Sequence, residues 1–354
     1  MNVGFKCEYF TVFVFIFNND FFRDYYGFIP WYGEVCYESY PHLTVYFSPK
    51  CREAYSFVEE FSGRSVDVRV FNLNGRVIYE GSCRLERCVN PLLPSILVGR
   101  IRLDEKIANA SYADVELGEF KWSVKIPNLV RVYGRITDFN GRPRRAYVMF
   151  ANPYGFPGGT AIVKTGDDGF YEMLVPEALY HHVFICDGNY GRKTLEFYGW
   201  HVAVKPPEFR LDARFDKIEV YRLTVAETPE RTLLIEFVPM DIFHTVRGAE
   251  RIYREKGRFD LSDLSREDLW PKFSLGEIEV YLDDQRLELR SLSHRLHSLI
   301  DHGAEGFRPS HLVEAKIPES LPPGVYDLKI VLCKDCGGFK EYGEAVYFSL
   351  ELWC

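Results

Sequence analysis

Apolar and polar residues alternate along most of this chain, which is the pattern of half-buried β-strands. In the stretch SVDVRVFNLNGRVIYEG, the side chains of Val66, Val68 and Val70 alternate with polar ones, and the alternation resumes after Asn74-Gly75. Asn-Gly between two alternating runs is the strongest short-range signal for a β-hairpin. We therefore predict a hairpin here, and strands dominate the prediction for the whole chain.

A second stretch, RVYGRITDFNGRPRRAYVMF, also has two alternating runs, separated by Asn140-Gly141. The same reasoning predicts a hairpin over residues 131–150. Three basic residues, Arg142, Arg144 and Arg145, lie where its second run begins. The simplest interpretation is a solvated turn whose charges keep an edge strand from pairing with another chain.

Turn signals recur every 8–12 residues, a spacing typical of β-sandwiches. The predicted fold class is all-β, with three tandem β-sandwich units at 1–128, 129–210 and 211–354. The first boundary follows the proline of IPNL, and the second follows VKPPEF. Two segments interrupt the strand pattern of the third unit, and we predict short helical insertions at 245–273 and 291–307.

The second unit carries a recurring set of turn and core residues. It resembles the carboxypeptidase regulatory-like family, a small transthyretin-like sandwich, over residues 130–209. The resemblance implies a non-catalytic module, often found on secreted or surface proteins, and it brings no catalytic residues. The residues that carry it are Gly134, Arg135, Ile136, Thr137, Asp138, Gly141, Arg142, Pro143, Ala146, Tyr147, Val148, Thr165, Gly169, Tyr171 and Tyr180.

The chain departs from this family's pattern at two places. Arg144-Arg145 replaces an apolar residue and a glycine, and Glu177-Ala178 replaces Pro-Gly before Tyr180. In the third unit, LPPGVYDLKIVL at 321–332 resembles a strand of immunoglobulin-like sandwiches, so that unit is predicted to be immunoglobulin-like.

Composition narrows the functional classes. The net charge is −8, which argues against general nucleic-acid binding, because that function needs a basic face. Aromatic residues make up 16%, which favours strands. Gln285 is the only glutamine, and depletion of heat-labile amides indicates a thermophilic prokaryote such as an archaeon.

The N-terminal segment contains one apolar run, FTVFVFIF. It is too short to span a bilayer, and no basic region precedes it. We therefore expect a buried strand there, with no signal peptide and no transmembrane segment.

A histidine-rich segment is the best candidate for metal chemistry. On a helix over 291–307, His294, His297 and Asp301 would lie along one face, with His302 beside them. Imidazoles and a carboxylate are zinc ligands, so a zinc site and a metal-dependent hydrolase are one hypothesis. The alternative is that the leucines of this segment form the buried face of the helix and the histidines lie on its solvent-exposed face. We expect no cofactor, and zinc or calcium are the candidates if one is bound.

The nine cysteines leave several arrangements open. Cys333 and Cys336 form a C-x-x-C pair that could be a disulfide, two free thiols or half of a zinc site. Cys83 and Cys88 could form a local disulfide.

Aromatic side chains are dense in the stretch 20–42. Tyr26, Phe28, Trp31 and Tyr32 could present a binding platform to a sugar or a protein. They could equally fill the core of the first unit.

No nucleophile elbow, P-loop, dinucleotide fingerprint or zinc-protease motif occurs in the chain. The leading hypothesis is therefore a non-catalytic binding or structural protein of the cell envelope. It would present loops or sheet edges to a protein or glycan, and it could form oligomers by pairing of sheet edges. The alternatives are the metal-dependent hydrolase and a cytosolic scaffold.

Overall fold

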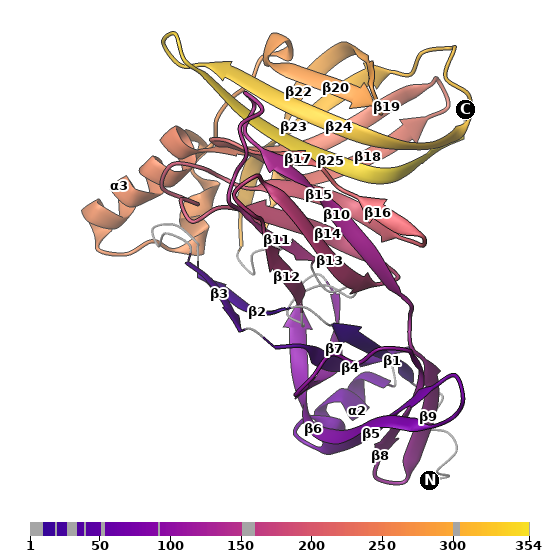
Figure 1. The fold of residues 1–354 in the computed structure, drawn as a ribbon. Helices are drawn as coiled ribbons and strands as arrows, with labels where there is room; N and C mark the ends of the chain where they lie inside the picture. Colours follow the sequence, from indigo (N-terminus) through magenta and orange to yellow (C-terminus); the bar gives the residue numbers. More distant parts are fainter. Residues whose placement is uncertain are drawn as a thin grey trace.

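A computed structural model shows that the chain is an all-β protein, which confirms the predicted fold class. Figure 1 shows the first unit at the bottom, the second in the middle and the third at the top. The structure describes residues 10–17, 20–26, 34–38, 40–50, 54–90, 93–150, 160–299 and 305–353.

The first unit is built on a seven-stranded sheet and one helix, α2 (Ala54–Phe61). One face of the sheet and the helix enclose a core of Phe, Val and Leu side chains. In sheet order the strands are β1 (Phe10–Phe17), β4 (His42–Pro49), β7 (Leu93–Arg102), β6 (Val77–Asn90), β5 (Ser65–Asn72), β8 (Ala110–Leu117) and β9 (Phe120–Lys125).

Local sequence explains this sheet. Val66, Val68 and Val70 are fully buried, while the polar residues between them face outward. The predicted hairpin joins β5 to β6, and Gly75 takes a positive φ of 75° that its turn requires. The apolar run at the N-terminus forms the buried strand β1, as predicted.

The second unit is a sandwich of two layers, of which the first mixes antiparallel and parallel pairs. One layer contains β13 (Phe170–Pro176), β10 (Leu129–Thr137), β16 (Glu208–Arg210) and β17 (Ala213–Arg214). The other contains β12 (Thr160–Lys164), β11 (Tyr147–Phe150), β14 (Ala178–Cys186) and β15 (Phe197–Val204).

The hairpin predicted over 131–150 is wrong, although its turn exists. Gly141 donates its N–H to the carbonyl of Asp138, and its φ is positive. The returning chain pairs with β10 only around Pro143 and Arg144. It then crosses to the opposite layer, where β11 pairs with β12 and β14. The Pro-Arg-Arg segment is therefore a corner between two sheets.

The third unit is a second sandwich. Its first layer has the strands β18 (Ile218–Thr228), β19 (Thr232–Asp241), β23 (Phe307–Lys316) and β22 (Glu288–Ser298). The facing layer has β21 (Gln285–Arg286), β20 (Ile278–Leu282), β24 (Gly324–Asp335) and β25 (Lys340–Leu352).

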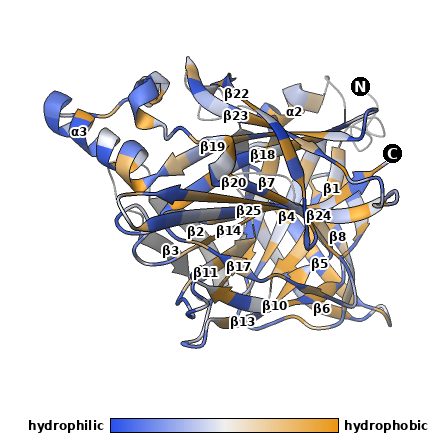
Figure 2. Ribbon diagram, turned by 90° about the horizontal axis from the view of Figure 1, so that it is seen from above, coloured by the Kyte–Doolittle hydropathy of each residue, from blue (hydrophilic) through white to orange (hydrophobic). Residues whose placement is uncertain are grey.

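The insertion at 245–273 is helical, as predicted, and Figure 2 shows it as a mainly hydrophilic projection on one side. Its elements are the π-turn η1 (Ile242–Val246), the helix α3 (Arg247–Lys256) and the 3₁₀ turns η2 (Leu261–Ser265) and η3 (Glu267–Leu269), followed by η4 (Leu275–Glu277).

The helix predicted over 291–307 is wrong. Residues up to Ser298 continue β22, which pairs with β23 in an unbroken ladder past His294. Leucines at helical spacing suggested a buried stripe, yet Leu296 is 68% exposed because cross-strand pairing fixes an extended backbone.

Strand pairing joins the three units. One ten-stranded sheet runs β21-β20-β24-β25-β15-β14-β11-β12-β2-β3, and it includes β2 (Asp20–Tyr26) and β3 (Glu34–Glu38) from the first unit. The parallel pair β15–β25 links the second unit to the third. A single core cluster contains Phe15 and Phe17 together with Val132 and Tyr180. The boundaries near 129 and 211 stay predictions, and pairing and packing both cross them.

Residues behind the family resemblance have structural roles. A Cβ on Gly134 would lie 1.9 Å from the carbonyl oxygen of Leu211, so only glycine fits there. The hydroxyl of Tyr171 donates to the same carbonyl at 2.9 Å. Tyr180 donates to the carbonyl of Pro176 at 2.8 Å, four residues earlier, in the manner of a tyrosine corner.

The basic turn of the second unit helps to hold the third. The ring of Phe139 stacks on Tyr342 of β25, with 4.7 Å between ring centroids. The guanidinium of Arg214 lies 4.6 Å from the centroid of Phe139 and pairs with Glu344. Arg145 pairs with Asp167 within the second unit at 2.5 Å. The charges of this turn are therefore used internally.

Candidate functional site: an acidic pocket on the first sheet

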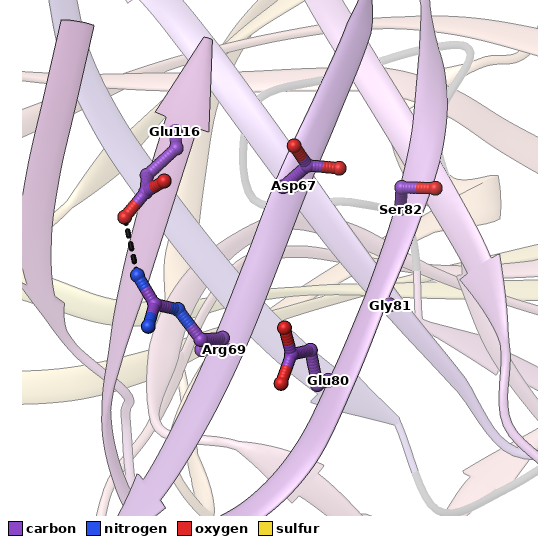
Figure 3. A pocket seen from close by; sticks show the side chains of 6 residues that line it. All are labelled: Asp67, Arg69, Glu80, Gly81, Ser82 and Glu116. Atoms are coloured by element: carbon purple, nitrogen blue, oxygen red, sulfur yellow. Dashed lines mark hydrogen bonds and ion pairs between the residues drawn. The ribbon is translucent and has the colours of Figure 1, made fainter.

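The outer face of the first sheet carries a shallow pocket of about 480 Å³. Figure 3 shows its side chains rising from three neighbouring strands, β8, β5 and β6. The pocket is lined by Asp67, Arg69, Glu80, Gly81, Ser82 and Glu116.

Strand register brings these residues together. Asp67 lies opposite Ser82 on one side and Glu116 on the other, and Arg69 lies opposite Glu80. Because side chains alternate between the two faces of a sheet, the buried valines of β5 force these polar side chains outward.

Ion pairs hold one side of the pocket. Arg69 donates to Glu116 at 2.5 Å, as Figure 3 shows, and Lys121 of β9 lies 3.2 Å from the same carboxylate. The hydrogen bonds from Lys121 and Arg69 lower the pKa of Glu116, so this carboxylate is ionised at neutral pH. Lys121 also binds Asp114 at 3.1 Å.

The other side of the pocket carries a pair of carboxylates. Within the described part of the chain, the carboxylates of Asp67 and Glu80 have no ion-pair partner. Both residues are exposed. Two cations of this face, Lys121 and Arg69, are paired with Asp114 and Glu116. The open part of the pocket therefore attracts a positively charged or hydroxyl-rich group.

An aromatic pair borders the pocket on the same face. The rings of Phe71 and Tyr112 stack with centroids 4.6 Å apart and planes 7° apart. They stand opposite each other on β5 and β8, one step along the outer face from Arg69 and Asp114. Both are half-buried, so they offer apolar surface next to the carboxylates.

A second polar cluster is buried between the second and third units. Glu196 directly precedes β15, and Glu219 is the second residue of β18. The two residues are only 3% and 1% exposed, and their carboxyl groups interact with each other. Burial raises the pKa of Glu219 to about 8 and raises that of Glu196 well above its usual value.

The predicted aromatic platform falls mostly outside the described residues. Phe28, Trp31 and Tyr32 lie outside them, and Tyr26 is the last residue of β2. A binding role for these aromatics stays a prediction.

The two predicted metal ligands that the structure describes, His294 and His297, do not share a helix face. His294 and His297 lie on a strand, where residues three apart face opposite sides. His294 packs against His311, with ring centroids 4.6 Å apart, while Nδ1 of His297 lies 3.5 Å from Glu236. Asp301 and His302 lie outside the described residues. Among the residues described, no group of three or more possible metal ligands gathers.

Three of the cysteines predicted to form disulfides have thiols that the structure describes. Cys83, Cys333 and Cys336 are free, so the disulfides proposed for them are wrong. Cys83 and Cys88 share the extended strand β6, which separates their Cα atoms by roughly 16 Å, too far for a bridge. The thiols of Cys333 and Cys336 bond instead to different partners, Tyr342 and Glu341.

The sequence prediction missed both polar clusters. The pocket residues could have been predicted from the sequence, because residues that alternate with buried valines must face outward. A weaker signal marked Glu196, which alternates with Tyr198 and Trp200 on one face of an apolar strand. Its meeting with Glu219 depends on tertiary packing and left no local signal.

Comparison with known proteins does not identify a family. No family model matches the chain, and no curated protein matches it. Solved structures that align with the chain include the major pilin subunit of Bacillus cereus, 9% identical, with a TM-score of 0.19 over 63% of this chain and 70% of that one.

Two further structures align over more of the chain. A protein from Corynebacterium diphtheriae described as membrane-anchored is 10% identical, with a TM-score of 0.18 over 97% of this chain and 98% of that one. A chain from the structure of Dpr2 Ig1–Ig2 in complex with DIP-Theta Ig1–Ig3 is 6% identical, with a TM-score of 0.15 over 87% of this chain and 94% of that one. At such scores the likeness carries no argument about function.

Within the described residues, no helix is both long and apolar enough to cross a bilayer.

Proposed function

We propose that this chain is a non-catalytic binding protein whose first unit engages a partner through the acidic pocket. The fused second and third units would serve as a stiff support. The observation that carries the proposal is a pair of carboxylates in an open pocket, Asp67 and Glu80, which form no ion pair with the described residues.

Charge defines the partner. A lysine or arginine side chain of another protein would place its cation between Asp67 and Glu80 and form an ion pair with both carboxylates. Arg69 lies opposite Glu80 but is ion-paired with Glu116, so its charge offsets that of Glu80 only in part. Binding through such exposed charges should weaken as salt is raised.

A glycan is the second candidate partner, and the stacked Phe71–Tyr112 pair favours it. Sugar rings pack against aromatic side chains, and carboxylates accept hydrogen bonds from sugar hydroxyls. Such binding would depend little on salt, which separates it from recognition of a basic side chain.

The support role rests on the continuous ten-stranded sheet. We also propose that the second unit belongs to the carboxypeptidase regulatory-like family and that the protein acts at the cell envelope, as that resemblance implies. Labelling of intact cells with an impermeant reagent tests the location. Labelling only after lysis would favour a cytosolic scaffold instead.

The pocket is tested by removing its free charges. We expect the double variant Asp67→Asn, Glu80→Gln to bind tetralysine and tetra-arginine peptides about tenfold more weakly than the wild type, in calorimetric titrations at low salt. A glycan array, probed with both proteins, tests the second candidate.

A matched control removes the same charge elsewhere in the first unit. Glu105 and Glu119 are exposed and lie outside the pocket, so Glu105→Gln, Glu119→Gln should bind as the wild type does. Equal losses in both double variants would show that only net charge matters, and the pocket would not be a site.

A further inference from the structure

The joint between the second and third units contains two carboxyl groups in contact. Glu196 comes from the second unit and Glu219 from the third, and both residues are almost completely buried next to each other. Two ionised carboxylates next to each other in a buried site would repel without water to screen them, so the pair holds a proton. The hydroxyls of Tyr190 and Tyr198 also donate to Oε1 of Glu196, at 2.9 and 3.4 Å.

Few groups around the pair could stabilise two negative charges if the proton were lost. Glu219 makes no hydrogen bond to a donor of the described protein, and the nearby cation is the fully buried Arg308 of β23. Its guanidinium lies 5.2 Å from the ring centroid of Tyr221 and 5.9 Å from that of Trp270. The titratable and charged groups that face the pair or its immediate shell are Cys186, Asp187, Tyr190, Tyr198, Tyr221 and Arg308.

The pair lies beside the seam that joins the two units. There β15 pairs in parallel with β25, and Trp200 and Tyr198 of β15 contact Tyr221 of β18, with ring centroids 5.8 and 5.5 Å apart. A second negative charge at this position would have no water to solvate it.

We propose that the proton shared by Glu196 and Glu219 latches the second unit to the third, and that the joint loosens when alkaline pH removes it. This inference does not depend on the pocket of the first unit. Both carboxyl groups are neutral or share one charge in the folded protein but ionise freely in the unfolded chain. Their stabilisation is therefore complete below the unfolded pKa of 4.5 and is lost as pH rises through the folded value of about 8 for Glu219.

Two variants and the pH dependence of melting test the latch. Between pH 5 and pH 9 we expect the melting temperature of the wild type to fall by about 5 °C or more. The double variant Glu196→Gln, Glu219→Gln cannot ionise, so its melting temperature should change much less. The control Glu80→Gln, on the exposed pocket, should follow the wild type. Parallel curves for the wild type and the double variant would overturn the proposal.

Two measurements keep the test decisive if the double variant folds poorly. In the wild type at pH 6.5, well above the pKa of a solvated carboxyl group, infrared spectroscopy should show the carbonyl band of a protonated acid. Its absence would also overturn the latch. Hydrogen exchange, corrected for intrinsic rates, should speed up at pH 9 in β15 and β18 more than in β5. A uniform change would show general loosening without a latch.

Discussion

Glutamates in two regions of this protein differ in charge state, although their side chains are identical. On the first sheet, Glu116 is reached by water and bound by Lys121 and Arg69, and its pKa is lowered. At the joint, Glu219 is buried against another carboxyl group, and its pKa is raised to about 8. Access to water and to cations therefore decides whether a carboxyl group offers a charge to partners or keeps a proton.

The largest expected effect comes from making the same substitution in both regions. Glu219→Lys would bury an ammonium near Arg308, with no carboxylate to compensate both cations fully. We expect a loss of about 4 kcal/mol or more in the free energy of unfolding, or failure to fold. Glu80→Lys on the open pocket should change it by less than about 0.5 kcal/mol.

Chemical denaturation of the two variants measures this contrast. Similar losses in both would contradict the description of the joint as a dry site. A Glu80→Lys variant that is much less stable than the wild type would instead show that the pocket has a structural role.

The next effect concerns acid pH, where a buried imidazole should matter. Burial and the neighbouring His181 lower the pKa of His182 to about 3, below its unfolded value of 6.5. Its contribution to stability is therefore complete above pH 6.5 and is lost as pH falls toward 3. At pH 4.5 the loss should be roughly 2–3 kcal/mol.

The variant His182→Phe isolates this term, because phenylalanine fills a similar space beside Tyr198 and Trp200 and does not titrate. Urea denaturation at pH 7 and pH 4.5 should show a smaller acid-induced loss for the variant than for the wild type. An unchanged difference between the two pH values would assign acid sensitivity to other groups.

The smallest effect compares two copies of one motif. Tyr180 and Tyr326 each donate to the carbonyl of a proline four residues earlier, Pro176 and Pro322, both at 2.8 Å. Tyr180 is fully buried and Tyr326 is half-buried. Tyr180→Phe should cost about 1 kcal/mol, and Tyr326→Phe less than half of that, since water can reach the second carbonyl. Equal losses in thermal melts would show that exposure does not set the value of this bond.

Local patterns predicted the elements better than their pairing. Alternation identified β5 and the Asn74-Gly75 turn, because short-range geometry determines both. The same signal at Asn140-Gly141 gave the right turn and the wrong partner strand. A sandwich corner and a hairpin share turn chemistry, and only the packing of the two layers distinguishes them.

For the histidine segment, the predicted type of element is itself wrong. Its leucines are compatible with helical and extended backbones, and the ladder between β22 and β23 selects the extended one. The acidic pocket follows from alternation alone, whereas the carboxyl pair at the joint requires knowing that β15 and β18 meet.

The position of β25 has a consequence for synthesis of the chain. This strand is made after every other strand of the ten-stranded sheet, yet it lies between β24 and β15 in the middle of that sheet. Its contact between His201 and Phe348 closes a loop of 147 positions. Until the ribosome has released β25, the edge of β15 and the aromatic side chains beside it stay uncovered. The emerging chain therefore has a long interval in which chaperones, or an erroneous strand from a neighbouring chain, can reach that edge.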